Sequence, residues 1–198
     1  MHDTVSAFAA EKYVVVPSMV GEPRLSSLCK YARKRMAMNP TEVEKMNIDP
    51  SAEPTPAAYG DMMIDMLLAS LTPQVEQATG LKLFPTFSYY RVYRRGDRLK
   101  KHKDRLACEI AVTLCLGYTG EPRWPLWLES PGGDASVTLG PGDAVVYRGI
   151  ECPHWREALK GEEAVQAFLF YVDQNGPHAE HKFDKRKALS SFRGLGKW

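Results

Sequence analysis

The sequence predicts an α+β protein in which a sandwich of β-sheets is backed by N-terminal helices. Segments with helical periodicity occupy much of the first 80 residues, and six short β-rich runs follow from about residue 87. Helices grouped before strands favour sheet layers with helices on one side. The chain has 198 residues and no internal repeat, which suits one domain. We expect helical support over about 1–80, a β-rich core over about 83–175 and a basic tail over 176–198.

The N-terminal part is predicted to contain one strand and two helices. Residues 12–16 (KYVVV) are typical of a strand, and residues 24–36 place apolar side chains at helical spacing opposite a basic face. A second helix over about 59–71 has an apolar face that includes Met63 and Met66, which we expect in the core, and Pro73 ends or restarts it. Between the helices, residues 39–56 contain four prolines and little periodicity, which indicates either a lid or an ordered surface loop.

The C-terminal part alternates β-rich runs with turn signals rich in glycine, proline and aspartate. The predicted strands are FSYYRVY (87–93), ACEIAVTLCLG (107–117), PLWLE (125–129), ASVTL (135–139), DAVVYR (143–148) and AVQAFLFYVD (164–173).

Composition and charge are those of a soluble globular protein, with 44% hydrophobic residues, 25% charged residues and a net charge of +2. The small net charge mildly disfavours a nucleic-acid partner, and the basic residues near the C-terminus are typical of a solvated tail. No apolar stretch approaches the roughly 20 residues of a membrane helix, and the N-terminus lacks the pattern of a signal peptide. The four cysteines form no CxxC pair, so neither a disulfide framework nor a zinc knuckle is indicated. We expect a cytoplasmic protein without a membrane partner.

One constellation suggests metal chemistry. His102 and Asp104 stand two residues apart at the start of a buried strand, and His154 follows the strand DAVVYR. Residues two apart in a strand point to one face, so the imidazole and the carboxylate can converge. Two histidines and one carboxylate are the ligand set of a mononuclear non-haem iron(II) site. The alternative is that the two histidines are unrelated surface or core residues.

These residues lie in a wider pattern. The run YRVYRRGDRLKKHKD resembles the approach to the metal in prolyl-hydroxylase-like 2-oxoglutarate/Fe(II) dioxygenases, and GPGDAVVYRGIECPHWREALKGEEAVQAFLFYVD resembles their second half. The opening KYVVVPSMVGEPRLSSLCKYA is similar to the strand and helix with which such proteins begin. The resemblance implies a double-stranded β-helix, which is a cupin-like jelly roll, with Fe(II) held by His102, Asp104 and His154. It also implies 2-oxoglutarate as cosubstrate and O2 as oxidant, and activity that falls in acid as the histidines protonate.

One departure from the family concerns the cosubstrate. The family places an arginine or lysine after the distal histidine to pair with the far carboxylate of 2-oxoglutarate, whereas residues 163–167 here contain no basic residue. Gln166 is a neutral candidate, and Arg91 and Arg105 are cationic ones, although either arginine can instead be a structural ion-pair partner. Tyr93 matches the family's cosubstrate-binding tyrosine.

The substrate side is less defined. We expect substrate contacts from residues near the distal histidine and the predicted barrel mouth, namely Trp155, Arg148, Tyr147 and Trp127. Trp155 is equally well explained as a core aromatic residue. Arg148 and Arg156 either bind an anionic group of the substrate or face solvent.

The function that the resemblance implies is oxidation of a C–H bond, most simply hydroxylation, of a small molecule or peptide, with release of succinate and carbon dioxide. One alternative is oxidation within a macromolecule, such as protein prolyl hydroxylation or nucleic-acid demethylation. Two others are a cupin metalloenzyme that does not use 2-oxoglutarate and a non-catalytic jelly-roll binding module. The sequence does not indicate an oligomeric state.

Overall fold

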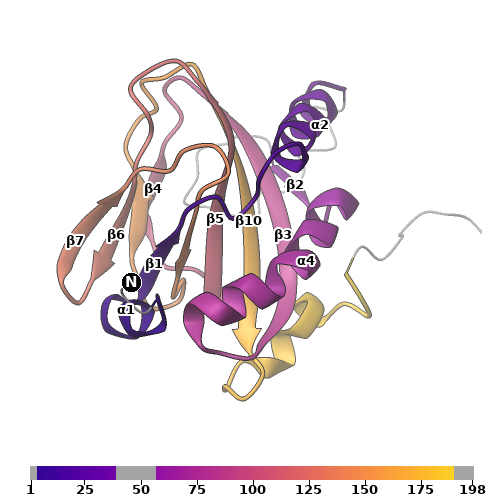
Figure 1. The fold of residues 1–198 in the computed structure, drawn as a ribbon, viewed down its shortest axis with the longest axis vertical. Coiled ribbons are helices and arrows are strands. Elements are labelled where there is room, and N and C mark those ends of the chain that lie inside the picture. The colour runs from indigo at the N-terminus through magenta and orange to yellow at the C-terminus, as the bar shows by residue number, and fades with distance from the viewer. Residues whose placement is uncertain (1–3, 39–56, 190–198) are drawn as a thin grey trace, which may run out of the picture.

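The computed structural model describes residues 4–38 and 57–189, which form two facing β-sheets with helices on one outer side (Figure 1). The predicted lid, residues 39–56, and the end of the predicted basic tail lie outside the described residues. Within the described residues, no helix is both long and apolar enough to cross a membrane.

The larger sheet, here called the major sheet, has six strands in the order β1-β8-β5-β10-β3-β2. All of its pairings are antiparallel, and its centre is formed by three long strands that pair over most of their length. Its strands are β1 (Tyr13–Val16), β2 (Ala57–Tyr59), β3 (Leu83–Arg94), β5 (Ile110–Thr119), β8 (Ala144–Tyr147) and β10 (Glu163–Asp173).

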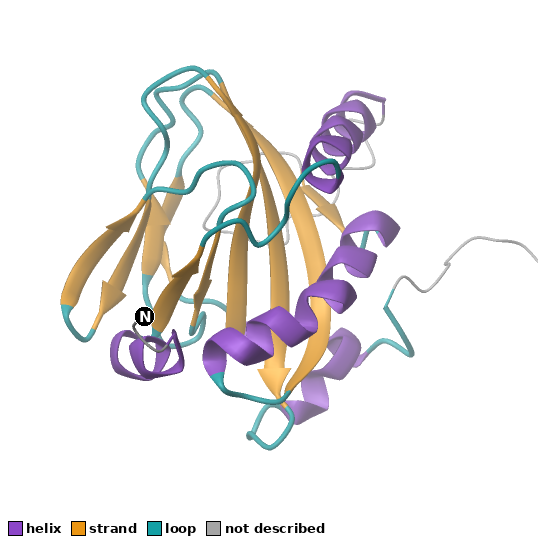
Figure 2. Cartoon of the chain, in the orientation of Figure 1, coloured by secondary structure: helices purple, strands orange, loops and turns teal. Residues whose placement is uncertain are grey.

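The smaller sheet, here called the minor sheet, has four strands in the order β4-β9-β6-β7. Its strands are β4 (Leu99–His102), β6 (Leu126–Ser130), β7 (Gly133–Val137) and β9 (His154–Arg156). Figure 2 shows the minor sheet on one side of the major sheet and the two long helices on the other. The predicted sandwich backed by helices is confirmed.

The helices cover the outer face of the major sheet. The chain contains α1 (Thr4–Glu11), α2 (Arg24–Met38) and α4 (Met62–Thr79), together with the short 3₁₀ segments η1 (Leu106–Cys108) and η2 (Ala179–Lys185). The buried faces of α2 and α4 pack against alternate residues of the central strands, such as Tyr90 of β3 and Leu169 of β10. The intervening residues of the same strands point the other way, toward the minor sheet, because side chains alternate along a strand.

Helix α4 differs from its prediction in three respects. It begins at Met62 because Asp61 caps the free N–H groups of Met63 and Ile64, and it ends where Gly80 adopts a left-handed conformation. Pro73 lies inside it rather than ending it, since the helix has a buried face on both sides of the proline. That face does not contain the predicted methionines: Met63 is 40% exposed and Met66 is 60% exposed. The predicted Leu67 and Leu71 are buried, and the full set of buried apolar residues is Ile64, Leu67, Leu68, Leu71, Val75 and Ala78.

The space between the sheets is lined by aromatic residues on one side. Along the inner face of β3 and β10, Phe87, Tyr89, Phe168 and Phe170 stack at centroid separations of 4.6–6.4 Å. Such contacts add to the burial of large apolar surfaces and hold the central strands rigid. A rigid inner face can position polar side chains that stand between the rings.

Candidate metal centre

The three predicted ligands meet at one end of the space between the sheets. His102 is the last residue of β4, His154 is the first residue of β9, and the two are direct partners in the antiparallel pair. Asp104 lies two residues beyond β4, so His102 and Asp104 stand at the end of a short strand of their own rather than opening the long strand β5. The carboxylate oxygen Oδ1 of Asp104 lies 3.6 Å from Nε2 of His102 and 3.7 Å from Nε2 of His154.

Backbone carbonyl groups orient both imidazole rings. Nδ1 of His102 is 2.9 Å from the carbonyl oxygen of Lys100, and Nδ1 of His154 is 3.0 Å from that of Cys152. A carbonyl can only accept a hydrogen bond, so each Nδ1 carries the proton and donates it. Each Nε2 then keeps its lone pair for a metal, which is how ligating histidines are usually oriented.

Asp104 is held by its backbone and by a close-packed glycine. Its N–H donates to the carbonyl oxygen of Gly149 at 3.0 Å. A Cβ atom at Gly149 would lie 2.4 Å from Oδ2 of Asp104 and 2.5 Å from the carbonyl oxygen of Cys108, so only glycine fits here. The Oδ2 atom is buried and has no hydrogen-bond partner. Burying a carboxylate oxygen without a partner costs folding free energy unless a cation or a hydrogen-bond donor lies beside it.

The residues present fit a divalent metal ion. The possible ligand atoms of His102, Asp104 and His154 all lie within 4.8 Å of one another. Divalent metals bind such atoms at about 2.0–2.2 Å, and ligands at right angles are then about 3 Å apart, so a small contraction would complete the site. Two imidazoles and one carboxylate grouped on one side are the ligand set of non-haem iron(II).

Tyr147 lies directly beside this centre. Its ring contacts that of His154 edge-on at a centroid distance of 4.8 Å. Burial raises the pKa of its hydroxyl well above the usual value, and the negative charge of Asp104 acts in the same direction. Tyr147 is therefore a neutral hydroxyl group near the candidate metal position.

Three of the predicted cosubstrate residues project into the same interior. Arg91 and Tyr93 stand on the inner face of β3, and Gln166 stands opposite Arg91 on β10. Arg91 is 2% exposed and its guanidinium lies 5.6 Å from the ring centre of Tyr89. Oε1 of Gln166 is buried without a hydrogen-bond partner.

Arg105 is placed differently. Its guanidinium donates to both carboxylate oxygens of Asp184, at 2.7 and 2.8 Å, and lies over the ring of Phe87. It is thus the ion-pair partner of a carboxylate within the chain, which was the structural alternative considered for it.

Arg156 is buried in the interior. The sequence alone allowed either a substrate contact or a solvent-exposed position for it. It is 3% exposed and follows His154 by two residues in β9, so both side chains point to the inner face. Burial lowers the pKa of its guanidinium below the usual value. The only signal in the sequence was this spacing of two from a predicted ligand.

Three predicted substrate residues lie elsewhere. Trp127 and Trp155 are partners across β6 and β9 and stack at 5.9 Å on the opposite face of the minor sheet from His154. Lys101 lies 4.5 Å above Trp155 and pairs with Glu129 on the same face. Arg148 pairs with Glu151 at 3.3 Å and lies over Phe8 of α1. Of the four predicted substrate residues, the structure brings only Tyr147 to the metal centre.

Comparison with known proteins finds matches among solved structures and none among family models or curated sequences. No protein-family model matches the sequence, and no curated protein matches it. A prolyl-4-hydroxylase from Pseudomonas putida superposes with a TM-score of 0.68 at 18% identity, covering 86% of this chain and 97% of that one. The epimerase SnoN, solved with Fe3+, alpha ketoglutarate and nogalamycin RO, gives 0.69 at 13% identity over 86% and 82% of the two chains.

A third structure extends this group. EctD from S. alaskensis, solved with 2-oxoglutarate and 5-hydroxyectoine, superposes with a TM-score of 0.67 at 12% identity over 87% of this chain and 76% of that one. The similar proteins thus include a prolyl-4-hydroxylase and an epimerase, so one fold accompanies different reactions. The chain described here has the jelly-roll fold of non-haem iron oxygenases that use 2-oxoglutarate.

Proposed function

We propose that this protein is an Fe(II)- and 2-oxoglutarate-dependent oxygenase that oxidises, most simply hydroxylates, a C–H bond of a small molecule or peptide. One oxygen atom of O2 would enter the substrate and the other would enter succinate, with loss of carbon dioxide. The observation that carries the proposal is the convergence of His102, Asp104 and His154 at one end of the interior. Single-domain organisation and a cytoplasmic location remain predictions.

The chain's own residues would divide the work as follows. The two imidazoles and Asp104 would hold the metal on one side and leave the other side open to ligands. When bound, the metal and cosubstrate supply the oxidising chemistry. Tyr147 would offer a neutral hydrogen-bond donor beside the metal, since its pKa is raised by burial. The stacked rings of β3 and β10 would exclude water from the space between the sheets.

The similar proteins support a small-molecule or peptide substrate. They include a prolyl-4-hydroxylase, an epimerase of nogalamycin biosynthesis and a protein bound to 5-hydroxyectoine. Identities of 12–18% do not carry any of these reactions over to this chain.

Anaerobic titration of the purified protein with Fe(II) and then 2-oxoglutarate tests the proposal. Chelation of Fe(II) by a 2-oxo acid produces a weak visible charge-transfer band, so the band should appear only when both are present. Metal uptake without the band would favour a metalloenzyme that does not use 2-oxoglutarate, and no metal uptake would leave a binding module.

A further inference from the structure

Arg156 is a cation buried between the two sheets. It is 3% exposed, and its described neighbours are aromatic rings, a thiol and a backbone carbonyl. One nitrogen, Nη1, donates to the carbonyl oxygen of Trp124, and the guanidinium lies 4.6 Å from the centre of that ring. Within residues 4–38 and 57–189, no carboxylate lies within ion-pair distance of it.

This arrangement leaves the guanidinium under-compensated. Arginine has five N–H donors and stays protonated in proteins, and its Nε has no hydrogen-bond partner here. Burying a cation without an anion is strongly unfavourable, and one hydrogen bond to a carbonyl offsets only part of that penalty. A bound anion would supply both the missing charge and the missing acceptors.

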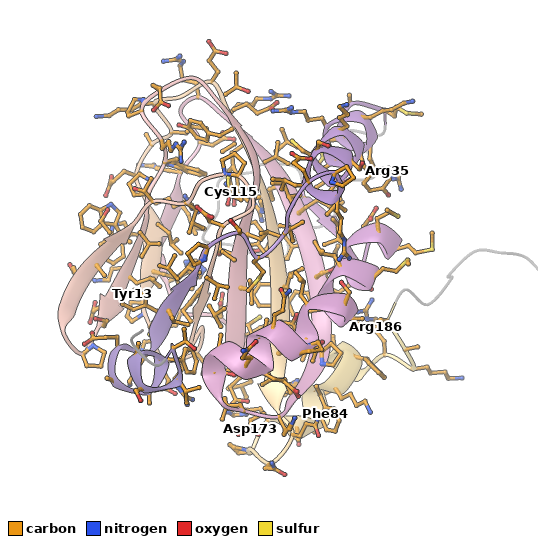
Figure 3. The ribbon with its side chains drawn as sticks, viewed as in Figure 1. Tyr13, Arg35, Phe84, Cys115, Asp173 and Arg186 are labelled. Carbon is orange, nitrogen blue, oxygen red and sulfur yellow. The ribbon has the colours of Figure 1, made fainter. Side chains whose placement is uncertain are left out.

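The surroundings of Arg156 include a second incomplete polar group. Gln166 is the partner of Cys115 across β10 and β5, and its Oε1 atom is buried without a hydrogen-bond partner. Cys115 is labelled in Figure 3, in the layer of side chains between the sheets. The ring of Tyr93 packs edge-on against that of Trp124 at 4.8 Å, and Arg156 lies over the same Trp124 ring, so the phenol and the guanidinium share one neighbourhood. A guanidinium and a phenol are suitable donors for a carboxylate, and the amide of Gln166 adds a third donor once it is turned so that Nε2 takes the place of the unpartnered Oε1.

The position of Arg156 relative to the metal centre defines the ligand further. Two residues along a strand span roughly 6.5–7 Å, so Arg156 is displaced along β9 from His154 by about that distance, on the same inner face. A ligand that fills this space binds the metal at one end and carries its anionic group at the other. In 2-oxoglutarate, three C–C bonds of about 1.5 Å separate the keto carbon from the distal carboxylate, which suits this span.

We infer that Arg156 binds the distal carboxylate of 2-oxoglutarate, and that it does so from the strand of the distal histidine instead of from β10. The inference rests on the proposed function. It accounts for the absence of a basic residue in 163–167, where Gln166 occupies the inner face of β10. Arg105 is held by Asp184, so the remaining competitor is Arg91 on β3.

The test compares a dicarboxylate with its analogue that lacks the distal charge. Affinities of 2-oxoglutarate and 2-oxopentanoate for the Fe(II)-loaded protein are measured anaerobically by calorimetry and by the visible band. The variants are Arg156→Met, Arg156→Lys, Arg91→Met and, as a surface control, Arg24→Met on α2. Methionine keeps most of the side-chain volume, and thermal unfolding of each variant confirms that it is folded.

We expect Arg156→Met to weaken 2-oxoglutarate binding by about 100-fold or more and to leave 2-oxopentanoate binding unchanged, which abolishes the preference for the dicarboxylate. Arg156→Lys should restore part of that preference, because it keeps the charge but not the paired donors. An alteration of packing alone would weaken both ligands equally and would overturn the inference.

Other outcomes separate the two proposals. Suppose that the wild-type protein forms the band. If Arg156→Met still prefers 2-oxoglutarate over 2-oxopentanoate, or if Arg91→Met is the variant that loses this preference, the assignment of Arg156 is wrong and the proposed function stands. If the wild-type protein binds no metal or forms no band, the proposed function and the inference fail together.

Discussion

Asp184 of the C-terminal segment accepts two hydrogen bonds from Arg105, the residue that follows Asp104. The hydroxyl of Tyr59 in β2 donates to the same carboxylate. Asp184 therefore ties the loop that carries a candidate metal ligand to the edge of the major sheet. Tyr59 and Asp184 are far in sequence from the candidate metal ligands, and only Arg105 of this cluster is next to one of them.

The backbone at Asp184 is strained. Phe183, Asp184 and Lys185 have φ angles of 54°, 54° and 59°, in the left-handed region that non-glycine residues avoid. Arg186 continues the attachment: it lies near α4 in Figure 3, and its guanidinium is 3.5 Å from the buried carboxylate of Asp65. Three such residues in succession persist only where surrounding contacts hold them.

Replacing Asp184 by asparagine should destabilise the protein by about 1–2 kcal/mol. The change removes a two-pronged charge-assisted interaction, whose value is reduced because Arg105 is 46% exposed. The melting temperature should fall by roughly 2–8 °C in a thermal unfolding experiment. Asp134→Asn, at an exposed position of β7, serves as the control and should leave the melting temperature unchanged. Equal melting temperatures for Asp184→Asn and the wild type would show that the ion pair does not stabilise the fold.

The same carboxylate should produce an acid-dependent loss of stability. Burial alone would raise the pKa of Asp184, but the hydrogen bonds from Arg105 and Tyr59 outweigh burial and lower the pKa below its usual value. A group with a lowered folded pKa stabilises fully above its unfolded pKa of about 3.9, and this contribution is lost as the pH falls through the folded pKa. Urea unfolding at a series of pH values should therefore give a constant difference between wild type and Asp184→Asn from pH 7 to about pH 5. The difference should shrink below about pH 4, and a difference that persists to lower pH would exclude titration of this carboxylate.

His102→Ala and Asp104→Ala should each abolish succinate formation and weaken Fe(II) binding. Loss of a group that merely orients a ligand commonly lowers metal affinity by about 10–100-fold, so loss of a ligand itself should lower it further. Calorimetric titration with Fe(II) under anaerobic conditions measures the affinity. His181→Ala is the matched control, since His181 lies in η2 beside Glu180 and is outside the metal centre. Unchanged turnover in either ligand variant would refute the metal assignment.

Gly149→Ala should displace Asp104 without removing it. The added methyl group would overlap Oδ2 of Asp104 and the carbonyl of Cys108, so the loop must shift. Overpacking of this kind costs about 1–3 kcal/mol, and we expect Fe(II) affinity to fall by about tenfold or more. Gly21→Ala is the control because a Cβ atom there meets nothing within 4 Å. If both variants bind Fe(II) equally well, the loop adapts and the close approach is not needed.

The long elements of this fold could be predicted from the sequence because local patterns determine them. The central strands contain continuous apolar runs, and α2 has one apolar face and one basic face. By contrast, β4 and β9 have four and three residues, and their identity depends on pairing with each other across fifty residues. No window of sequence contains that information.

The candidate site shows the same division. The three candidate metal ligands could be selected because histidine and aspartate are chemically distinctive and because both groups stand next to predicted strands. The direction of the side chains in β9 could not be predicted, because a strand of three residues is too short to show a periodicity. Trp155 was therefore expected near the substrate, whereas the structure places it on the outer face and places Arg156 inside.

The alternation along β9 has a consequence for how this protein can change. His154 and Arg156 point into the interior, whereas Trp155 stacks on Trp127 on the outer face of the minor sheet. Adjacent residues of β9 are therefore under different structural constraints. Substitutions at the tryptophans can alter that exterior without touching the chemistry beneath it. Inserting or deleting one residue within β9 would exchange its inner and outer faces, because side chains alternate along a strand. This strand can therefore vary in composition but not in length.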